Sequence, residues 1–346
     1  MLVGVNYPWF DYGWDFGLGP PAWRGGRTIP RWYDEIDNHL ALFHDLGLTV
    51  VRWFILGDGL TYGRGDAAPR PDPLRPGQWR FNPPPLDADH LAHFRELLVR
   101  FSRFNANTDT PVQLLPVLID FGFCEPGVRP VDAADAADPM QDPGWVKCGR
   151  ADILIDPSKR TRFFEGVLEP LLGLSQEHRD ALYAWELMNE PDWVTNGWHP
   201  DHRNNHPIGE ASMRAFLEDG KQRIRRARFK PTIGFSLLAT LERSRITAEI
   251  NQFHHYPAGA RRLAPHTFSP EFPAIVGEFA TAETDIWPEL ARTDQSVLAR
   301  LTHLEALGYP LALPWSFRTK DTHTVWSSAV EQHIRAFNTA PRPPAT

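Results

Sequence analysis

Short apolar runs recur along the chain, and longer stretches with the spacing of amphipathic helices lie between them. Short apolar runs bounded by turn residues predict buried strands. Eight of them lie at residues 2–6, 50–56, 113–121, 181–189, 232–236, 251–255, 274–277 and 311–315. Helical periodicity predicts helices at residues 33–46, 87–104, 157–172, 210–228, 294–307 and 325–337. Alternating strands and helices predict a parallel sheet of the α/β class. Eight strands favour its closure into a (β/α)8 TIM barrel over an open sheet.

Two long stretches rich in proline and glycine directly follow predicted strands, at residues 57–85 and 124–150. The loops that follow the strands of a barrel form its active-site face, so these stretches are expected to line a site rather than to link domains. The connections after the fifth and sixth strands are predicted to be short and irregular. No domain boundary is visible. One domain is therefore expected over residues 1–340, with residues 341–346 as a frayed tail.

The composition is that of a globular protein, with 346 residues of which 42% are hydrophobic and 23% charged. The formal charge of −7 argues against nucleic acid or an anionic membrane as the main partner. No apolar run approaches the ~20 residues of a membrane span. No signal peptide is visible after Met1, so a cytoplasmic location is expected if Met1 is native, and secretion if a leader had been removed. Cys124 and Cys148 are too few for a disulfide scaffold, and free thiols are expected, although pairing within their shared loop stays open.

Two glutamates stand where apolar, strand-like runs stop, in Leu187-Met188-Asn189-Glu190-Pro191 and in Ile275-Val276-Gly277-Glu278-Phe279. The tips of the fourth and seventh strands would face each other across the mouth of a barrel. Cleavage of a glycosidic bond needs such a pair, one carboxyl to protonate the leaving oxygen and one to attack or stabilise the sugar carbon. The alternative is that both are solvated surface glutamates.

Five segments together resemble clan A glycoside hydrolases, most closely the cellulase- and mannanase-like glycoside hydrolase family 5: Asn189-Glu190-Pro191, Gly277-Glu278-Phe279, Arg52 on the second strand, His254-His255-Tyr256 on the sixth, and Trp315 on the eighth. The resemblance implies that Glu190 is the general acid/base and Glu278 the nucleophile. It further implies that Asn189 binds the sugar 2-hydroxyl, Arg52 orients the nucleophile, Tyr256 donates to it, His254 belongs to the same site, and Trp315 forms the floor under the reacting sugar.

Elementary chemistry supports these roles. An arginine and a phenol donor near a nucleophilic carboxylate lower its pKa, whereas burial and a neighbouring negative charge raise the pKa of an acid. Arg52 lies inside an apolar strand and needs an acidic partner, and strand alternation offers Glu186 for this. His254 and His255 point to opposite faces, so only one of them can line the barrel.

One departure from the family concerns the third strand. A histidine is common in the family two residues after an aspartate there, but the segment Ile119-Asp120-Phe121-Gly122 has glycine in that place. Asp120 is expected to take part of the missing contact with a sugar hydroxyl. The departure bears on the substrate more than on the chemistry.

Thirteen tryptophans are many for this length. Aromatic faces stack on the apolar faces of sugars, so Trp14, Trp193 and Trp198, in predicted loops, are candidate sugar contacts. The alternative is that such residues pin loops to the barrel. The histidines at 199, 202 and 206 have a spacing that suggests a metal, but prolines interrupt it and no acidic or cysteine partner completes a set. Neither a metal nor a cofactor is expected.

The sequence thus predicts a retaining β-glycoside hydrolase that cleaves O-glycosidic bonds of β-linked oligosaccharides or glycosides in two displacements, through a glycosyl-enzyme. The partner is a carbohydrate. The alternatives are a transglycosylase and a catalytically silent sugar-binding barrel. The sugar, the linkage, endo or exo action and the oligomeric state stay open.

Overall fold

The computed structural model describes residues 1–10, 15–17, 29–59, 61–62, 70–126, 147–199, 206–257, 263, 273–318 and 321–341. Eight parallel strands close into a barrel in which each strand pairs with its neighbours in the chain and the first strand pairs with the last. These strands are β1 (Leu2–Asn6), β2 (Val50–Phe54), β5 (Gln113–Ile119), β6 (Trp185–Asn189), β7 (Pro231–Phe235), β8 (Asn251–His255), β9 (Ala274–Ala280) and β10 (Leu311–Trp315). The predicted (β/α)8 barrel is confirmed.

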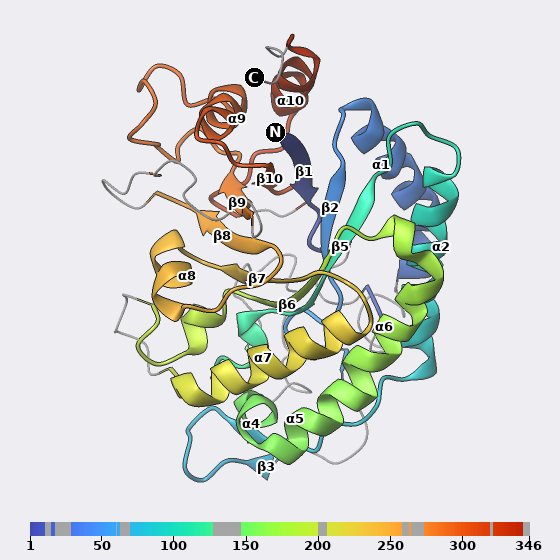
Figure 1. Ribbon diagram of the computed structural model, residues 1–346, viewed down its shortest axis with the longest axis vertical. Coiled ribbons are helices and arrows are strands. Elements are labelled where there is room, and N and C mark those ends of the chain that lie inside the picture. Colours follow the sequence, from blue (N-terminus) through green and yellow to red (C-terminus); the bar gives the residue numbers. More distant parts are fainter. Residues whose placement is uncertain are drawn as a thin grey trace.

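Helices surround this barrel on the outside (Figure 1). The long ones are α1 (Tyr33–Asp45), α2 (Ala88–Asn105), α7 (Glu210–Arg226), α9 (Val297–Ala306) and α10 (Ser328–Thr339), and a further helical segment runs through α5 (Pro157–Phe163), the π-turn η3 (Phe164–Leu168) and α6 (Glu169–Ser175). Side-chain caps explain where several of them begin. Asp87 accepts from the backbone of His90, and Ser296 accepts from the backbone of Ala299. All six predicted helices are present.

Several short elements were not expected from the sequence. They are η1 (Ile29–Trp32), the hairpin of β3 (Arg70–Pro71) and β4 (Trp79–Arg80), η2 (Phe121–Phe123), α4 (Ala151–Ile155), η4 (Gln176–Ala181), η5 (Pro191–Val194) and α8 (Leu238–Ser244). The connection after the fifth barrel strand, predicted as irregular, contains the two-turn helix α8. Most of the connection after the sixth strand lies outside the described residues, as do residues 342–346 of the predicted tail.

Two strands carry an irregularity next to the predicted catalytic glutamates. Along β9, Val276 pairs with Phe253 but Glu278 pairs with His254, so Gly277 is an extra residue on β9. Between β6 and β7, Glu186 and Asn189 pair with residues only two apart on β7. Bulges of this kind re-aim the side chains that follow them. The prediction that β9 stops at Glu278 was wrong, because the bulge lets the strand continue to Ala280.

The inside of the barrel is apolar at one end and polar at the other. An apolar cluster fills the end where the strands begin, with Val50, Leu115, Ala184, Ile275 and Leu313 among its members. Buried polar side chains occupy the end where the strands finish, which is where barrels of this kind place their sites. The larger apolar core lies between the strands and the surrounding helices. Cys124 and Cys148 are buried free thiols, as expected.

No helix among the described residues has the length and apolarity to cross a membrane.

Candidate active site

Glu190 directly follows β6 and has a left-handed backbone, with φ of 45° and ψ of 51°. A non-glycine residue pays about 1–2 kcal/mol for this conformation. Two hydrogen bonds hold it there: the backbone N–H of Glu190 donates to Gly234 O at 2.6 Å, and the N–H of Trp193 donates to Glu190 O at 3.1 Å. The turn ends the strand and directs the Glu190 side chain over the barrel mouth.

Glu278 lies just after the Gly277 bulge in β9, and two donors hold its carboxylate. Arg52 Nη1 donates to Oε1 at 2.6 Å, and Tyr256 Oη donates to Oε2 at 2.9 Å. These are the two partners predicted for a nucleophile. A Cβ at position 277 would stand 2.4 Å from Gln252 Nε2, so any larger residue in the bulge would have to displace the Gln252 side chain.

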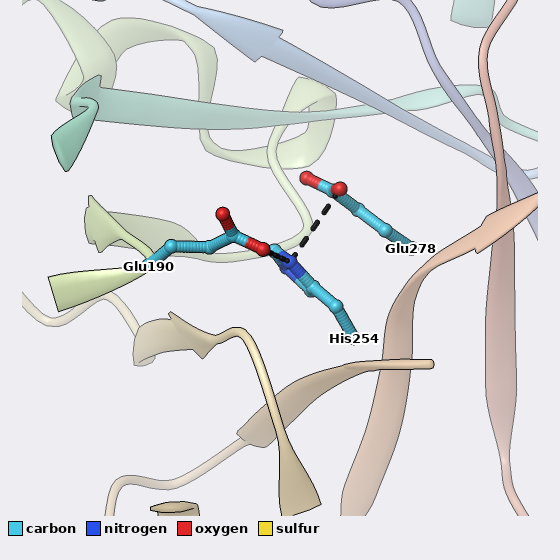
Figure 2. Close-up of side chains that lie close together, drawn as sticks. All are labelled: Glu190, His254 and Glu278. Carbon is cyan, nitrogen blue, oxygen red and sulfur yellow. Dashed lines mark hydrogen bonds and ion pairs between the residues drawn. The ribbon is translucent and has the colours of Figure 1, made fainter. Parts of the chain in front are cut away.

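His254 lies between the two glutamates (Figure 2). Its Nδ1 is 2.7 Å from Glu190 Oε1 and 3.4 Å from Glu278 Oε2. One carboxylate oxygen of each glutamate and the His254 nitrogen all lie within 4.8 Å of one another. The two carboxyl groups therefore face each other across a short gap. As expected, the neighbouring His255 points to the other side of the strand, where its ring meets Trp287.

Arg52 is fully buried and joins the residues of this site. Its guanidinium forms a two-point contact with Glu186, at 2.7 and 2.6 Å, so the predicted acidic partner is confirmed. It also donates to Asn6 at 2.9 Å and to Asn189 at 2.6 Å. Glu186 and Asn189, three residues apart, would point to opposite faces of a regular strand. The irregularity in β6 brings both to the inside.

The space beside Arg52 depends on a glycine. A Cβ at Gly234 would stand 2.5 Å from Glu186 Oε1, 2.9 Å from Gln252 Nε2 and 3.1 Å from His254 Nε2. Gln252 itself donates to Glu186 at 2.9 Å. The polar layer under the site is therefore packed closely around a residue without a side chain.

Asn189 links this layer to Asp120, with Nδ2 donating to Asp120 Oδ1 at 2.7 Å. Asp120 also lies within hydrogen-bonding reach of Asp58. Burial raises the pKa of Asp120 to about 6, although the hydrogen bonds from Asn189 and Asp58 oppose this shift. Where the family has a histidine, the Gly122 backbone N–H faces Asp120 Oδ2 at 3.4 Å. Asp120 thus lies beside the site.

The predicted sugar-binding tryptophans have different surroundings. Trp315 packs against Phe54 and Val117, with Tyr256 beside them, and its Nε1 donates to Asp321 at 2.7 Å. Trp193 stacks on His199 with ring centroids 3.8 Å apart, and its side chain lies within hydrogen-bonding reach of Glu190.

Of the other two predicted tryptophans, the structure describes only Trp198. Trp198 is 2% exposed and packs in the apolar core near Phe235, so the structure does not bring it to the site. Its spacing from Glu190 along the chain could not reveal this, because the loop folds back on the barrel. Trp14 lies outside the described residues.

The two glutamates differ in their electrostatics. Burial raises the pKa of Glu190 well above its usual value, and the negative charges of Asp192 and Asp120 add to this. Burial also raises the pKa of Glu278, to about 7, while the charge of Arg52 and the hydrogen bond from Tyr256 act against it. The sequence led to the expectation of a lowered pKa for Glu278. Arg52 and Tyr256 do act in that direction, but the cost of burying the charge outweighs them.

The raised pKa of Glu190 is the direction that a general acid requires. The imidazole of His254 stays neutral, since burial lowers its pKa. Burial, and then the charge of Glu278, raise the pKa of Tyr256, so its phenol keeps the proton that it donates.

Among the described residues, a metal ion could be held only by the group of Glu190, His254 and Glu278. Arg52 and Tyr256 already donate to Glu278 there, and a cation would have to stand close to the guanidinium. Of the three loop histidines, the structure describes two, and each of these has another contact. His199 stacks on Trp193, His206 Nδ1 is 2.7 Å from the Trp193 carbonyl oxygen, and position 202 lies outside the described residues.

Sequence reasoning overlooked several residues of the site. Asn6 ends β1 with a buried amide that donates to Gly277 O at 2.8 Å, and a polar residue after an apolar run was a signal for it. Gln252 is polar within a buried strand and carried the same signal. Asp321 and His323 had none, because they lie in a loop. Asp321 binds Trp315, and the His323 ring lies 4.9 Å from that of Tyr256.

No protein-family model matches the chain, and no curated protein matches its sequence. Solved structures do match its fold. A beta-mannanase from the blue mussel Mytilus edulis is 16% identical with a TM-score of 0.65, over 98% of this chain and 92% of the mannanase. An endo-1,4-beta-mannanase from Eisenia fetida is 17% identical with a TM-score of 0.65, over 99% and 91%. An exo-beta-1,4-mannosidase from Opitutaceae bacterium strain TAV5 is 17% identical with a TM-score of 0.53, over 97% and 55%.

At these identities the likeness is one of fold. The chain shares the (β/α)8 barrel of these enzymes over nearly its whole length.

Proposed function

We propose that this protein is a retaining β-glycoside hydrolase with Glu190 as general acid/base and Glu278 as nucleophile. One observation carries the proposal: the buried carboxyl group of Glu278 and that of Glu190, whose side chain is 13% exposed, face each other at the barrel mouth with His254 Nδ1 between them, at 3.4 and 2.7 Å. A chain that only bound sugar would have no need of this pair, whose burial costs free energy.

The separation of the carboxyl groups supports retention over inversion. Their facing oxygens lie within 4.8 Å of each other. Retaining enzymes have carboxyl groups ~5–5.5 Å apart, whereas inverting enzymes need ~6.5–9.5 Å to hold a water molecule between them.

The proposed reaction has two steps. Protonated Glu190 gives its proton to the glycosidic oxygen while ionised Glu278 attacks the anomeric carbon, so the bond to the leaving group breaks and a glycosyl ester forms. Esterification removes the negative charge of Glu278, which lowers the pKa of Glu190 and leaves it able to act as base. Glu190 then takes a proton from water, whose oxygen displaces Glu278. A sugar hydroxyl in place of water would give transglycosylation.

The other side chains have roles that follow from their contacts. Arg52 and Tyr256 hold Glu278 and favour its ionised form. Neutral His254 orients the Glu190 carboxyl. Asn189 uses one amide hydrogen on Asp120 and keeps the other for a sugar hydroxyl. Trp315, fixed by Asp321, offers a flat surface beside Tyr256.

β-Linked mannose is the first candidate sugar, because solved structures that share the whole fold are named beta-mannanases and an exo-beta-1,4-mannosidase. Glucosides come next, since the departure at Gly122 alters the surroundings of the sugar without touching the two glutamates. Both endo and exo action fit the barrel.

The test uses aryl β-glycosides of mannose, glucose, galactose, xylose and fucose, the cellobioside, and manno-oligosaccharides. The wild type is compared with Glu190→Ala, with and without azide, and with Glu278→Gln. Glu177→Gln is the matched control, because Glu177 is an exposed glutamate in η4. We expect the control to match the wild type, Glu278→Gln to lose activity, and azide to rescue Glu190→Ala with release of a β-glycosyl azide.

An α-configured azide product would overturn retention. Unchanged turnover in Glu278→Gln would overturn the mechanism. A wild type that binds sugars but cleaves none of the substrates, oligosaccharides included, would favour the silent sugar-binding barrel.

A further inference from the structure

Asp192 is a fully buried carboxyl two residues after Glu190, in the 3-10 turn η5, and the roles assigned above do not use it. Its Oδ1 accepts from the backbone N–H of Ser236 at 3.0 Å, and its Oδ2 accepts from the Ser236 hydroxyl. Ser236 directly follows β7. The side chain of Asp192 thus ties the turn after β6 to the end of the neighbouring strand.

This tie lies close to a second one. The Glu190 N–H donates to Gly234 O at 2.6 Å. Three hydrogen bonds, two of them donated by Ser236, therefore fix this turn to the end of β7 and to Ser236. Between these anchors Glu190 has its left-handed backbone, with φ of 45°. A strained conformation persists only where its surroundings over-determine it.

We propose that Asp192 is a positioning residue for Glu190: the Asp192–Ser236 pair clamps the left-handed turn that carries Glu190, and the buried Asp192 carboxylate stands beside the Glu190 carboxyl. The proposal rests on the proposed function, in which Glu190 is the acid/base. The Asp192 side chain would thus set both the direction of the Glu190 carboxyl and the pH up to which this carboxyl keeps its proton.

Every element around Glu190 contributes to its charge environment. Arg52 from β2 favours its ionised form, whereas Asp120, after β5, and Asp192 favour its protonated form. His254 from β8 is neutral and contacts its oxygen, and Glu278 from β9 faces it across the gap.

Asp192 stands out among these negative groups. It is the largest contributor after burial to the raised pKa of Glu190. Glu278 loses its charge when the glycosyl ester forms, but Asp192 does not react. The same group therefore stands near Glu190 in both steps of the proposed reaction.

Whether Asp192 is ionised depends on two opposed effects. Burial raises its pKa, and the two donors from Ser236 act against this. Asp294 provides a matched comparison on the surface. Its carboxylate likewise accepts from the backbone N–H and the hydroxyl of one serine, Ser296, at 3.3 and 2.7 Å. The hydrogen bonds from Ser296 lower the pKa of Asp294, because little burial opposes them.

The test is Asp192→Asn, with Asp294→Asn as the control that removes a carboxyl from the same kind of pair at an exposed position. Asparagine is isosteric, and its Oδ1 can still accept from the Ser236 N–H. The pH profile of kcat/KM is measured with the aryl glycoside that the wild type cleaves. Removing the Asp192 charge is expected to lower the pKa of Glu190, so the alkaline limb moves to lower pH by about 1 unit. Asp294→Asn is expected to leave it in place.

A direct titration separates this inference from the proposed function. With ¹³C-labelled glutamate carboxyls, and Glu190→Gln to assign the signal, the midpoint of Glu190 is read without any substrate. A midpoint about 1 unit lower in Asp192→Asn supports the inference even if no substrate is cleaved. An unmoved midpoint, together with an unmoved alkaline limb where there is activity, overturns it, because Asp192 would then carry no charge that Glu190 senses.

Ser236→Ala tests the clamp and keeps the test open if Asp192→Asn does not fold. The alanine leaves the backbone donor and the Asp192 carboxyl in place. We expect an unchanged KM and a kcat about tenfold lower, in line with a misdirected acid. An unchanged kcat in a folded Ser236→Ala would overturn the positioning role.

Discussion

Replacing Arg52 by methionine should destabilise the protein strongly, whatever the protein does. The guanidinium is fully buried and donates to four side chains, with two bonds to Glu186 and one each to Asn6, Asn189 and Glu278. Methionine fills similar space but offers no donor. The carboxylate of Glu186, which is itself 0% exposed, would stay in the barrel without its cation.

The size of the effect follows from that unpaired charge. Breaking a buried ion pair by removing one partner costs about 3–5 kcal/mol. Unfolding entropy is about 2.1 cal/mol/K per residue, which for 346 residues gives about 0.7 kcal/mol/K. The midpoint of thermal unfolding should therefore fall by about 4–7 °C in Arg52→Met.

The assay is calorimetric unfolding of Arg52→Met, Glu186→Gln and the double variant. In the double variant the neutral amide of the glutamine at position 186 no longer needs a cation. The decrease in its free energy of unfolding should therefore be about 2 kcal/mol smaller than the sum of the two single decreases. Arg225→Met is the control, because Arg225 forms the same two-point contact with Glu249, at 2.6 and 3.0 Å, but both side chains are about one-third exposed. Arg225→Met should lower the free energy of unfolding by about 1 kcal/mol or less.

The reasoning would be refuted if Arg52→Met cost no more than the control. Strict additivity of the two single variants would also refute it, since that would mean that Arg52 and Glu186 do not depend on each other.

Three further changes have defined outcomes. The pKa of Glu278 is raised to about 7, so the wild type loses stability as pH rises from about 4.5 through 7. In Glu278→Gln the free energy of unfolding should fall less between pH 4 and pH 8, by about 3 kcal/mol. An equal fall in both proteins would contradict this. Gly234→Ala should lower the free energy of unfolding by about 1–3 kcal/mol and reduce activity, because its Cβ would stand 2.5 Å from Glu186 Oε1. Gly173→Ala is the control, because Gly173 lies in a helix with open space around it, and it should be neutral or stabilising in the same denaturant titration. Tyr256→Phe removes a donor from Glu278, so the acidic limb of the kcat/KM profile should move to higher pH, with kcat about tenfold lower; an unmoved limb would show that the phenol does not act on the nucleophile.

Much of the fold follows from local pattern. Apolar runs and helical spacing located all eight barrel strands, three of them with the bounds found in the structure, because a strand in a parallel barrel is buried on both faces and reads as a continuous apolar stretch. Short elements such as α4 and α8 escaped notice, since two turns of helix are too few to establish a period.

The site was predicted in part for the same reason. A polar residue that ends an apolar run is conspicuous, so Asn189, Glu190 and Glu278 could be found without a structure. Arg52 and its partner Glu186 followed from the cost of an unpaired buried charge. Loop residues carry no such signal. Trp198, expected to bind sugar, packs in the core, and Asp321, which holds Trp315, went unnoticed.

The sequence by itself determined the barrel, because its buried strands read as apolar runs. It also identified the two facing glutamates, because each stands where such a run is interrupted. Only the tertiary structure decided how these residues act. The bulge at Gly277 and the irregular register after Glu186 turn side chains inward against simple alternation, and they depend on pairing between strands far apart in sequence. The raised pKa of Glu278 was likewise beyond the sequence, because the balance between Arg52 and burial depends on how much solvent the whole barrel excludes.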